Sequence, residues 1–282
     1  MGNHVSAARK TILVDGLVTG YLEAGQGDPV VLLHGGEFGV NAEIAWENTI
    51  GALAQRHRVL APEMLGFGES AKVIDFNDGR GMRIRHIARF CAAVGVESAH
   101  FVGNSMGAVN LFVDATSESP VLPARSLVMI CGGGEIQRNE YSAALYEYDA
   151  TLDGMRRIVE ALFYDRSYVA DESYVQRRYD SSIAPGAWEA LAGARFRRPG
   201  VEPPPLPSSA RAYDRIAVPT LLIEGGGDKL LPRGWAAEIA GQIASARSVV
   251  IPDAGHCPQI EQPAAVNDLL LAFLAEQREG AA

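Results

Sequence analysis

Short apolar segments alternate with segments of helical periodicity through the first 130 residues of the chain, and again after about residue 215. This alternation is typical of repeated βα units on a mostly parallel sheet. Eight strands are expected, at residues 11–14, 19–23, 30–34, 59–62, 99–102, 126–130, 220–224 and 248–251. Helices are expected between them, at residues 42–56, 83–94, 106–116, 235–243 and 263–276. The pattern therefore predicts an α/β protein, with an eight-stranded sheet flanked by helices.

The alternation is interrupted between residues 135 and 207, where the strand signal disappears and aromatic residues and arginines are frequent. Residues 199–207 include five prolines, which would form a stiff connection back to the sheet. We therefore predict a core domain in two parts, 1–134 and 208–282, with a helical lid at 135–207 inserted after the sixth strand. Most of the lid aromatics would pack its helices onto the core, and a few would line a cleft.

Charge and composition exclude several classes of protein. The 282 residues are 48% hydrophobic, enough for a full core, and their net charge of −9 disfavours nucleic acid and anionic membrane surfaces as partners. No apolar stretch approaches the roughly 20 residues of a membrane span, and the first ten residues contain no secretion signal. Cys91, Cys131 and Cys257 lie far apart, which argues against a disulfide framework or zinc site and for the cytoplasm. No metal-binding or nucleotide-binding motif is present, so no cofactor is expected.

A candidate nucleophile follows the fifth predicted strand. The segment Gly103-Asn104-Ser105-Met106-Gly107 comes directly after that strand and opens the next predicted helix. This is the strand–turn–helix context of a nucleophile elbow, which holds a serine hydroxyl at the carboxyl edge of the sheet beside a helix N-terminus. The five-residue pattern alone is common by chance, so its position between strand and helix carries the prediction that Ser105 is a nucleophile.

A serine needs a base to take its proton, and the base needs an acid to fix its tautomer. His256 lies in the loop after the last predicted strand, which a parallel sheet returns to the edge that holds Ser105. Asp228 follows three glycines at the end of strand 220–224 and is the predicted acid. Glu135, after the sixth strand, is the alternative acid.

Two backbone N–H groups are expected to bind the oxyanion of a tetrahedral intermediate. Met106 supplies the first, because it follows the nucleophile. The second comes from His34-Gly35-Gly36 after the third strand, where Gly36 is preferred over Gly35. His34 itself is expected to brace this loop rather than to move protons.

These segments, with Gly66-Phe67-Gly68-Glu69-Ser70, resemble the α/β-hydrolase family over nearly the whole chain, and the order Ser, Asp, His matches that family. Asn and Met beside the serine, Trp46-Glu47-Asn48 and Arg177-Arg178-Tyr179 resemble more narrowly the meta-cleavage-product hydrolases of bacterial aromatic degradation. The resemblance implies the α/β-hydrolase fold and a small aromatic dienoate substrate. The implied reaction hydrolyses a carbon–carbon bond in 2-hydroxy-6-oxo-6-arylhexa-2,4-dienoates, giving an aromatic acid and 2-hydroxypenta-2,4-dienoate. It also implies a homo-oligomer, a dimer or larger.

The same resemblance implies which residues hold the substrate. Members of this group bind the dienoate carboxylate and 2-oxygen with a lid arginine and asparagines. The implied substrate-binding residues here are Arg178, Asn48 and Asn104, with Gly35 and Cys257 on the pocket wall. Arg177 is the alternative to Arg178, and Asn41 the alternative to Asn48.

The chain departs from this group at two places that change the pocket wall. Glu37-Phe38-Gly39 replaces the usual Gly-Pro-Gly, and Cys257 stands where many members have tryptophan. Two other functions are therefore considered: a carboxylesterase or lactonase with the same catalytic residues, and a ligand receptor on a hydrolase scaffold.

Overall fold

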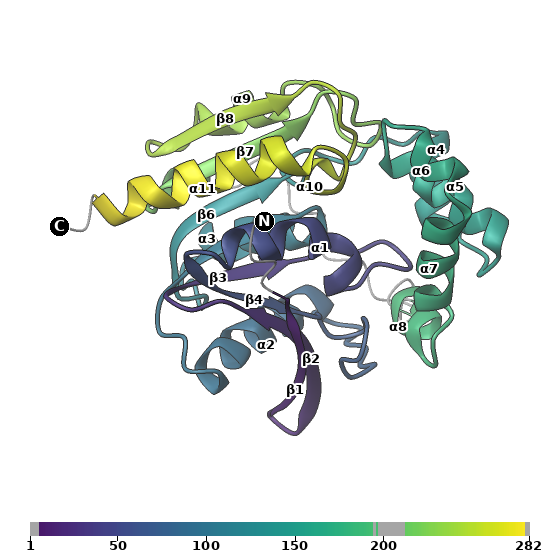
Figure 1. The fold of residues 1–282 in the computed structure, drawn as a ribbon, viewed down its shortest axis with the longest axis horizontal. Helices are drawn as coiled ribbons and strands as arrows, with labels where there is room; N and C mark the ends of the chain where they lie inside the picture. Colours follow the sequence, from purple (N-terminus) through teal and green to yellow (C-terminus); the bar gives the residue numbers. More distant parts are fainter. Residues whose placement is uncertain (1–5, 194–195, 197–211, 280–282) are drawn as a thin grey trace.

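The computed structural model describes residues 6–193, 196 and 212–279, and its strands form one sheet (Figure 1). The strands are β1 (Ala8–Val14), β2 (Leu17–Ala24), β3 (Asp28–Leu33), β4 (His57–Pro62), β5 (Ala99–Asn104), β6 (Ala124–Ile130), β7 (Thr220–Gly225) and β8 (Ala246–Ile251). Their order is β1-β2-β4-β3-β5-β6-β7-β8. β2 is antiparallel to both β1 and β4, and all other neighbours are parallel. The predicted eight-stranded, mostly parallel sheet is confirmed.

Helices cover both faces of this sheet. They are α1 (Ala42–Leu53), α2 (Gly79–Ala93), α3 (Met106–Ala115), α9 (Trp235–Ala240), α10 (Pro258–Glu261) and α11 (Pro263–Glu279), with a short 3-10 helix η1 (Tyr213–Arg215). α1 packs against α11, and α2 packs against α3. The central strand β3 is buried from Val30 to Leu33, as expected for a parallel strand that is covered on both faces. The five predicted core helices are confirmed, and the four-residue helix α10 was not predicted.

Among the described residues between β6 and β7, five further helices lie beside the carboxyl edge of the sheet (Figure 1, teal). They are α4 (Glu140–Tyr146), α5 (Leu152–Leu162), α6 (Ser167–Ala170), α7 (Glu172–Ser182) and α8 (Ala187–Gly193). In α5, Met155, Ile158, Val159 and Leu162 recur at helical spacing and are buried in a cluster that includes Phe38 of the β3–α1 loop. This cluster attaches the inserted helices to the core. The proline-rich stretch 199–207 lies outside the described residues.

Among the described residues, no helix is both long enough and apolar enough to cross a membrane.

Candidate active site

Ser105 stands at the sharp turn between β5 and α3. Its φ of +50° is a backbone conformation that non-glycine residues rarely adopt, and such strain is typical of functional turns. The glycines on either side leave space for this turn. A Cβ on Gly107 would lie 2.3 Å from the Leu33 carbonyl oxygen, and one on Gly103 would lie 2.5 Å from the Ala108 nitrogen. The local sequence therefore folds into the turn that an exposed serine hydroxyl requires.

The structure brings Ser105, Asp228 and His256 together, although Ser105 and His256 lie 151 positions apart along the chain. His256 Nε2 lies 2.9 Å from Ser105 Oγ, and His256 Nδ1 lies 2.8 Å from Asp228 Oδ2. The His256 and Asp228 side chains are each 3% exposed. These distances are those of hydrogen bonds, so the imidazole can accept the serine proton while the carboxylate fixes its tautomer. Glu135, the alternative acid, is exposed and makes neither contact.

Backbone contacts hold the acid and the base in place. Asp228 Oδ1 accepts a hydrogen bond from the Leu230 N–H at 2.8 Å, and the His256 N–H donates to the Leu162 carbonyl at 2.7 Å. Glu261 of α10 also links the His256 loop to the residues that follow α5. Its Oε1 accepts from the Gly255 N–H at 2.6 Å, and its Oε2 accepts from the N–H of Tyr164 at 2.7 Å. The loop that holds His256 is thus tied to the end of α5.

Burial and neighbouring charge act in opposite directions on His256. Burial lowers its pKa, but the charge of Asp228 and the hydrogen bond to it raise the pKa, with smaller contributions from Glu37 and Glu261. The net effect raises the pKa above the ordinary imidazole value of about 6.5. His256 is therefore a stronger proton acceptor than a free histidine.

The β3–α1 loop places Gly36 beside the start of α3. A Cβ on Gly36 would lie 2.9 Å from Met106 Cβ, so the two predicted oxyanion donors belong to backbones that face each other. His34 braces this loop: its Nδ1 lies 2.7 Å from the Gly35 oxygen, and its Nε2 accepts from the Met64 N–H at 3.0 Å. Burial lowers the pKa of His34 to about 4, so it is neutral and its ring nitrogens are both occupied.

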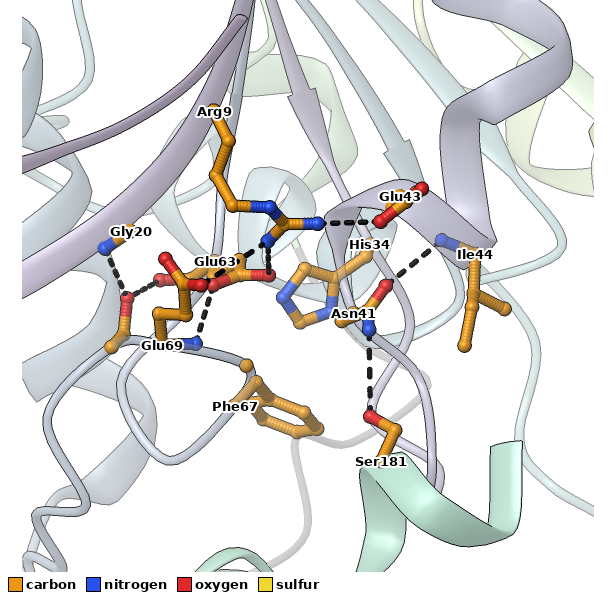
Figure 2. Close-up of polar contacts among 12 residues, drawn as sticks. Arg9, Gly20, His34, Asn41, Glu43, Ile44, Glu63, Phe67, Glu69 and Ser181 are labelled. Atoms are coloured by element: carbon orange, nitrogen blue, oxygen red, sulfur yellow. Dashed lines mark hydrogen bonds and ion pairs between the residues drawn. The ribbon is translucent and has the colours of Figure 1, made fainter. Parts of the chain in front are cut away.

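Figure 2 shows the residues that support His34. The ring of Phe67 packs edge-on against it, with centroids 4.8 Å apart, and the turn that holds Phe67 is fixed by the buried Glu63. Glu63 accepts from the Glu69 N–H at 2.6 Å and lies 3.6 Å from an Arg9 guanidinium nitrogen. Burial raises the pKa of Glu63. Glu63 and Arg9 therefore support the turn of Phe67, which itself lines the cavity, without lining the cavity themselves.

A cavity of about 320 Å³ opens in front of Ser105. Its walls are mostly apolar, with Glu37 and two arginines of α2 as charged members. The lining consists of Gly36, Glu37, Phe38, Phe67, Arg80, Arg83, Ser105, Met106, Val109, Ile136, Leu145, Tyr146, Leu162, Leu191 and His256. Another cavity, of about 330 Å³, lies at α1 and contains none of the three catalytic candidates. The cavity at Ser105 is therefore the candidate substrate site.

Arg178 does not line this cavity, because its guanidinium is fully buried against Glu37. Arg178 Nη2 lies 2.8 Å from Glu37 Oε1, and Nη1 donates to the Tyr174 hydroxyl at 3.2 Å. Burial lowers the pKa of Arg178, but Tyr174 and Glu37 outweigh that effect and the net shift is upward. Gly35 makes the space for this pair, since a Cβ there would lie 2.2 Å from Glu37 Oε2. The departure from Gly-Pro-Gly thus supplies Arg178 with a carboxylate from the protein itself.

Asn104 and Cys257 lie together behind His256. The Asn104 amide donates to the His256 carbonyl at 3.0 Å and to the Ile130 carbonyl at 3.3 Å, and the Cys257 sulfur lies 3.8 Å from Asn104 Oδ1. Both residues are 1% exposed. Their polar atoms are therefore engaged with the protein around the catalytic histidine.

The structure does not bring Asn48 to the cavity. It lies on the exposed face of α1, where its carbonyl accepts from the Asn267 amide at 2.8 Å, because its place on the helix turns it away from the buried Trp46. Asn41 caps α1 through the Ile44 N–H at 2.9 Å and reaches Ser181 of α7 at 3.5 Å (Figure 2). The implied role of Asn48 therefore has no geometric basis.

Arg177, the alternative to Arg178, also lies outside the cavity. It is exposed and pairs with Glu47 of α1 at 2.9 Å.

The sequence did not reveal two arginines of the site, or the ion-pair partner of Glu37. Glu37 was noticed as a departure but was not linked to Arg178, because no local pattern connects residues 141 positions apart. Arg80 and Arg83 were not assigned to the site, and the helix was expected to start at residue 83, which left Arg80 outside it. The available signal was Asp78, whose side chain accepts from the Gly81 N–H and starts α2 earlier.

Within the described residues, the group of side chains close enough to share a metal ion is Cys131, Asp228 and His256, with ligand atoms within 4.8 Å of one another. Asp228 and His256 are already hydrogen-bonded to each other. Burial and the nearby Asp228 raise the pKa of Cys131 well above the ordinary thiol value. A metal bound here would have to displace the thiol proton and the hydrogen bond between Asp228 and His256.

The fold and this arrangement define a serine hydrolase of the α/β type, and comparison with known proteins agrees. Residues 30–269 match the model of the alpha/beta hydrolase family, so the chain belongs to that family. Several relatives that it matches over most of their length are hydrolases of meta-cleavage products. It is 32% identical to 2-hydroxy-6-oxo-6-(2'-aminophenyl)hexa-2,4-dienoic acid hydrolase of Metapseudomonas resinovorans, over 94% of this chain and 90% of the relative. It is 33% identical to 2-hydroxymuconate semialdehyde hydrolase of Pseudomonas sp. strain CF600, over 95% and 94%.

A solved structure shows the same likeness in three dimensions. The meta-cleavage product hydrolase CumD of Pseudomonas fluorescens IP01, complexed with acetates, superposes with a TM-score of 0.84 at 31% identity. The match covers 98% of this chain and 99% of that one.

Proposed function

We propose that the chain is a serine-type hydrolase that cleaves the C5–C6 bond of 2-hydroxy-6-oxo-6-arylhexa-2,4-dienoates. The products are an aromatic acid and 2-hydroxypenta-2,4-dienoate. The observation that carries the proposal is the hydrogen-bonded set of Ser105, His256 and Asp228 at a mostly apolar cavity. Apolar walls suit an aryl group. The relative from Metapseudomonas resinovorans is a hydrolase of a 6-aryl dienoic acid, which supports the same chemistry here.

The first step is the transfer of a proton to C5. Carbon is a poor leaving group, so the bond breaks only when the departing fragment can hold the electron pair. Moving the proton of the 2-hydroxyl to C5 gives the 2-oxo form, which can do so. His256 is the group assigned to this transfer, since its Nε2 faces Ser105 and the cavity. Such general acid–base help contributes roughly 10²–10⁴-fold to a rate.

Ser105 Oγ then attacks C6 while His256 takes its proton, and the N–H groups of Gly36 and Met106 donate to the oxyanion. Collapse of this intermediate breaks C5–C6. The electron pair passes into the 2-oxo fragment, which takes a proton on its oxygen and leaves as 2-hydroxypenta-2,4-dienoate. Water, activated by His256, then hydrolyses the ester on Ser105, releases the aromatic acid and restores the enzyme.

The remaining predicted residues take indirect roles in this proposal. Asn104 and Cys257 position the His256 loop from behind, and Gly35 leaves space for Glu37. Arg178 does not line the cavity itself. It pairs with Glu37, which does. Leu145 and Leu162, which lie in the described part of the predicted lid (135–207), belong to the apolar wall of the cavity.

The test is to mix the enzyme with the yellow ring-cleavage product of 2,3-dihydroxybiphenyl and follow its visible absorbance. We expect rapid decay, and a much slower hydrolysis of p-nitrophenyl esters. The opposite preference would favour the carboxylesterase alternative. A fluorophosphonate probe that left Ser105 unlabelled would favour the receptor alternative.

The proposal includes a cytoplasmic homo-oligomer, a dimer or larger. Cys91, Cys131 and Cys257 are free, buried thiols, a state that a reducing compartment maintains. Light scattering checks the oligomer: a mass in solution near the 30.1 kDa of one chain would contradict it.

A further inference from the structure

Two arginines of α2 line the cavity that contains Ser105. Arg80 and Arg83 are three residues apart in the first turns of the helix, so they lie on one face of it. Among the described lining residues, the one acidic side chain is Glu37, and its carboxylate is already paired with Arg178. The cavity therefore combines a reactive serine, apolar walls and a cationic side.

The protein orients Arg83 through backbone and aromatic contacts, and no described carboxylate neutralises it. Its Nε donates to the Leu65 carbonyl at 3.1 Å, and Nη1 reaches the Gly79 carbonyl at 3.4 Å. The guanidinium carbon lies 6.0 Å from the centroid of the Phe67 ring. Within the described part of the chain, no Asp or Glu forms an ion pair with Arg83. By contrast, the exposed Arg85 of the same helix pairs with Asp78 at 2.8 Å.

This arrangement is unfavourable in the free protein. Burial lowers the pKa of Arg83, and the like charge of Arg80 lowers it further. Like charges at this helical spacing repel each other, and a half-buried charge without a counter-ion has lost part of its hydration. An anionic group bound in the cavity would relieve both effects. The chain as a whole carries a net charge of −9, so this cationic side is a local exception.

We propose that Arg80 and Arg83 bind a carboxylate of the substrate, so that its charged end lies against α2 and its hydrocarbon lies along the apolar wall. A guanidinium presents a planar pair of donors that matches a carboxylate. The inference rests on the proposed function, and it moves the carboxylate anchor from Arg178, which Glu37 already satisfies, to α2. The carboxylate is either that of the dienoate or a second acid group on the acyl half, and both have the same chemistry.

Binding to the full-length Ser105→Ala variant tests this directly, because that variant does not consume its ligand. Three ligands are compared by titration calorimetry: the 6-phenyl dienoate, its neutral methyl ester, and a dienedioate with a second carboxylate on the acyl half. We expect Arg83→Gln and Arg80→Gln, each added to Ser105→Ala, to weaken binding of the carboxylates by about 10- to 100-fold. The methyl ester should lose much less. Arg85→Gln is the matched control and should change nothing.

The pattern of losses identifies the source of the carboxylate. A loss shared by the phenyl dienoate and the dienedioate assigns the subsite to the dienoate carboxylate. A loss confined to the dienedioate assigns it to the second acid group. Equal losses for the methyl ester, or none beyond the Arg85→Gln control, would overturn the proposal. An Arg83→Lys variant, which keeps the charge, should restore part of the affinity and so separates a charge effect from misfolding.

The failure of this inference differs from a failure of the proposed function. If the wild-type enzyme binds dienoates through Arg80 and Arg83 but does not cleave them, the anion subsite stands and the reaction is wrong. If it cleaves them while the arginine variants bind normally, the reaction stands and the subsite is wrong.

Discussion

Arg178 and Arg83 differ in whether a carboxylate of the protein pairs with the guanidinium. Arg178 of α7 is fully buried, with Glu37 at 2.8 Å and the Tyr174 hydroxyl at 3.2 Å. Arg83 of α2 lines the cavity and contacts backbone carbonyls and an aromatic ring, but no described carboxylate. The charge of the first is satisfied within the fold. The charge of the second is available to a ligand.

This difference separates two uses of the same side chain. A buried ion pair joins the β3–α1 loop to α7 and so fixes the wall of the cavity. A cavity-facing guanidinium without a counter-ion offers binding energy to an anion. Both residues are arginines, so the residue type alone does not decide the role. What decides it is whether a carboxylate lies close to the guanidinium.

The largest expected effect leaves both arginines untouched. Ser105→Ala removes the nucleophile, and turnover of the dienoate should fall by at least about 10⁴-fold, as for other catalytic serines that act with a histidine. Binding should persist, because the cavity walls are unchanged, and it should be seen as a shifted absorption spectrum of the bound dienoate. Near wild-type turnover in this variant would remove Ser105 from the mechanism.

Arg178→Met should destabilise the fold by about 3–5 kcal/mol, because it leaves the Glu37 carboxylate buried without a partner. Arg83→Gln should cost only about 1 kcal/mol, the value of the hydrogen bonds to carbonyl oxygens that it loses. Urea unfolding measures both. Restoring a balanced pair of apolar residues, as in Glu37→Met with Arg178→Met, should recover most of the loss. Equal destabilisation by the two single variants would erase the contrast between the arginines.

Glu37→Gln should shift the acid limb of the kcat/KM profile to lower pH. His256 must be neutral to accept a proton, and its raised pKa means that activity falls as the pH drops through a value above about 6.5. Glu37 contributes to that raised value, so removing its charge lowers the pKa of His256 and extends activity to more acidic solutions. Glu47→Gln, which removes a carboxylate of α1 that pairs with Arg177, is the control. A shift in the opposite direction would contradict this account of the site.

Arg177→Ala should have the smallest effect. Its exposed pair with Glu47 is worth at most about 1 kcal/mol, and its side chain does not line the cavity. Steady-state kinetics should match the wild type within a factor of about two. A large loss specific to carboxylate substrates would show that Arg177, the neighbour of Arg178, belongs to the site.

The fold and the meeting of Ser105, His256 and Asp228 could be predicted because each follows a strand. Parallel strands end at the same edge, so the residues after β5, β7 and β8 meet there whatever their separation in sequence. The bounds of the lid at 135 and 207 stay a prediction, because the second of them lies outside the described residues.

The charged groups around the cavity could not be predicted in the same way. Glu37 and Arg178 come from a loop and a helix of the insertion, and their contact depends on how the insertion packs on the sheet. Asn48 was misplaced for a related reason, because a single helical position decides whether a side chain faces the cavity or solvent.

We expect the catalytic serine and histidine to break the carbon–carbon bond after a proton reaches C5. The most direct measurement is product analysis by NMR after complete turnover of the 6-phenyl dienoate in deuterated water. We predict equal amounts of benzoate and 2-hydroxypenta-2,4-dienoate, with one deuterium at C5 of the dienoate product. Products formed without deuterium at C5, or consumption of substrate without benzoate, would contradict this account.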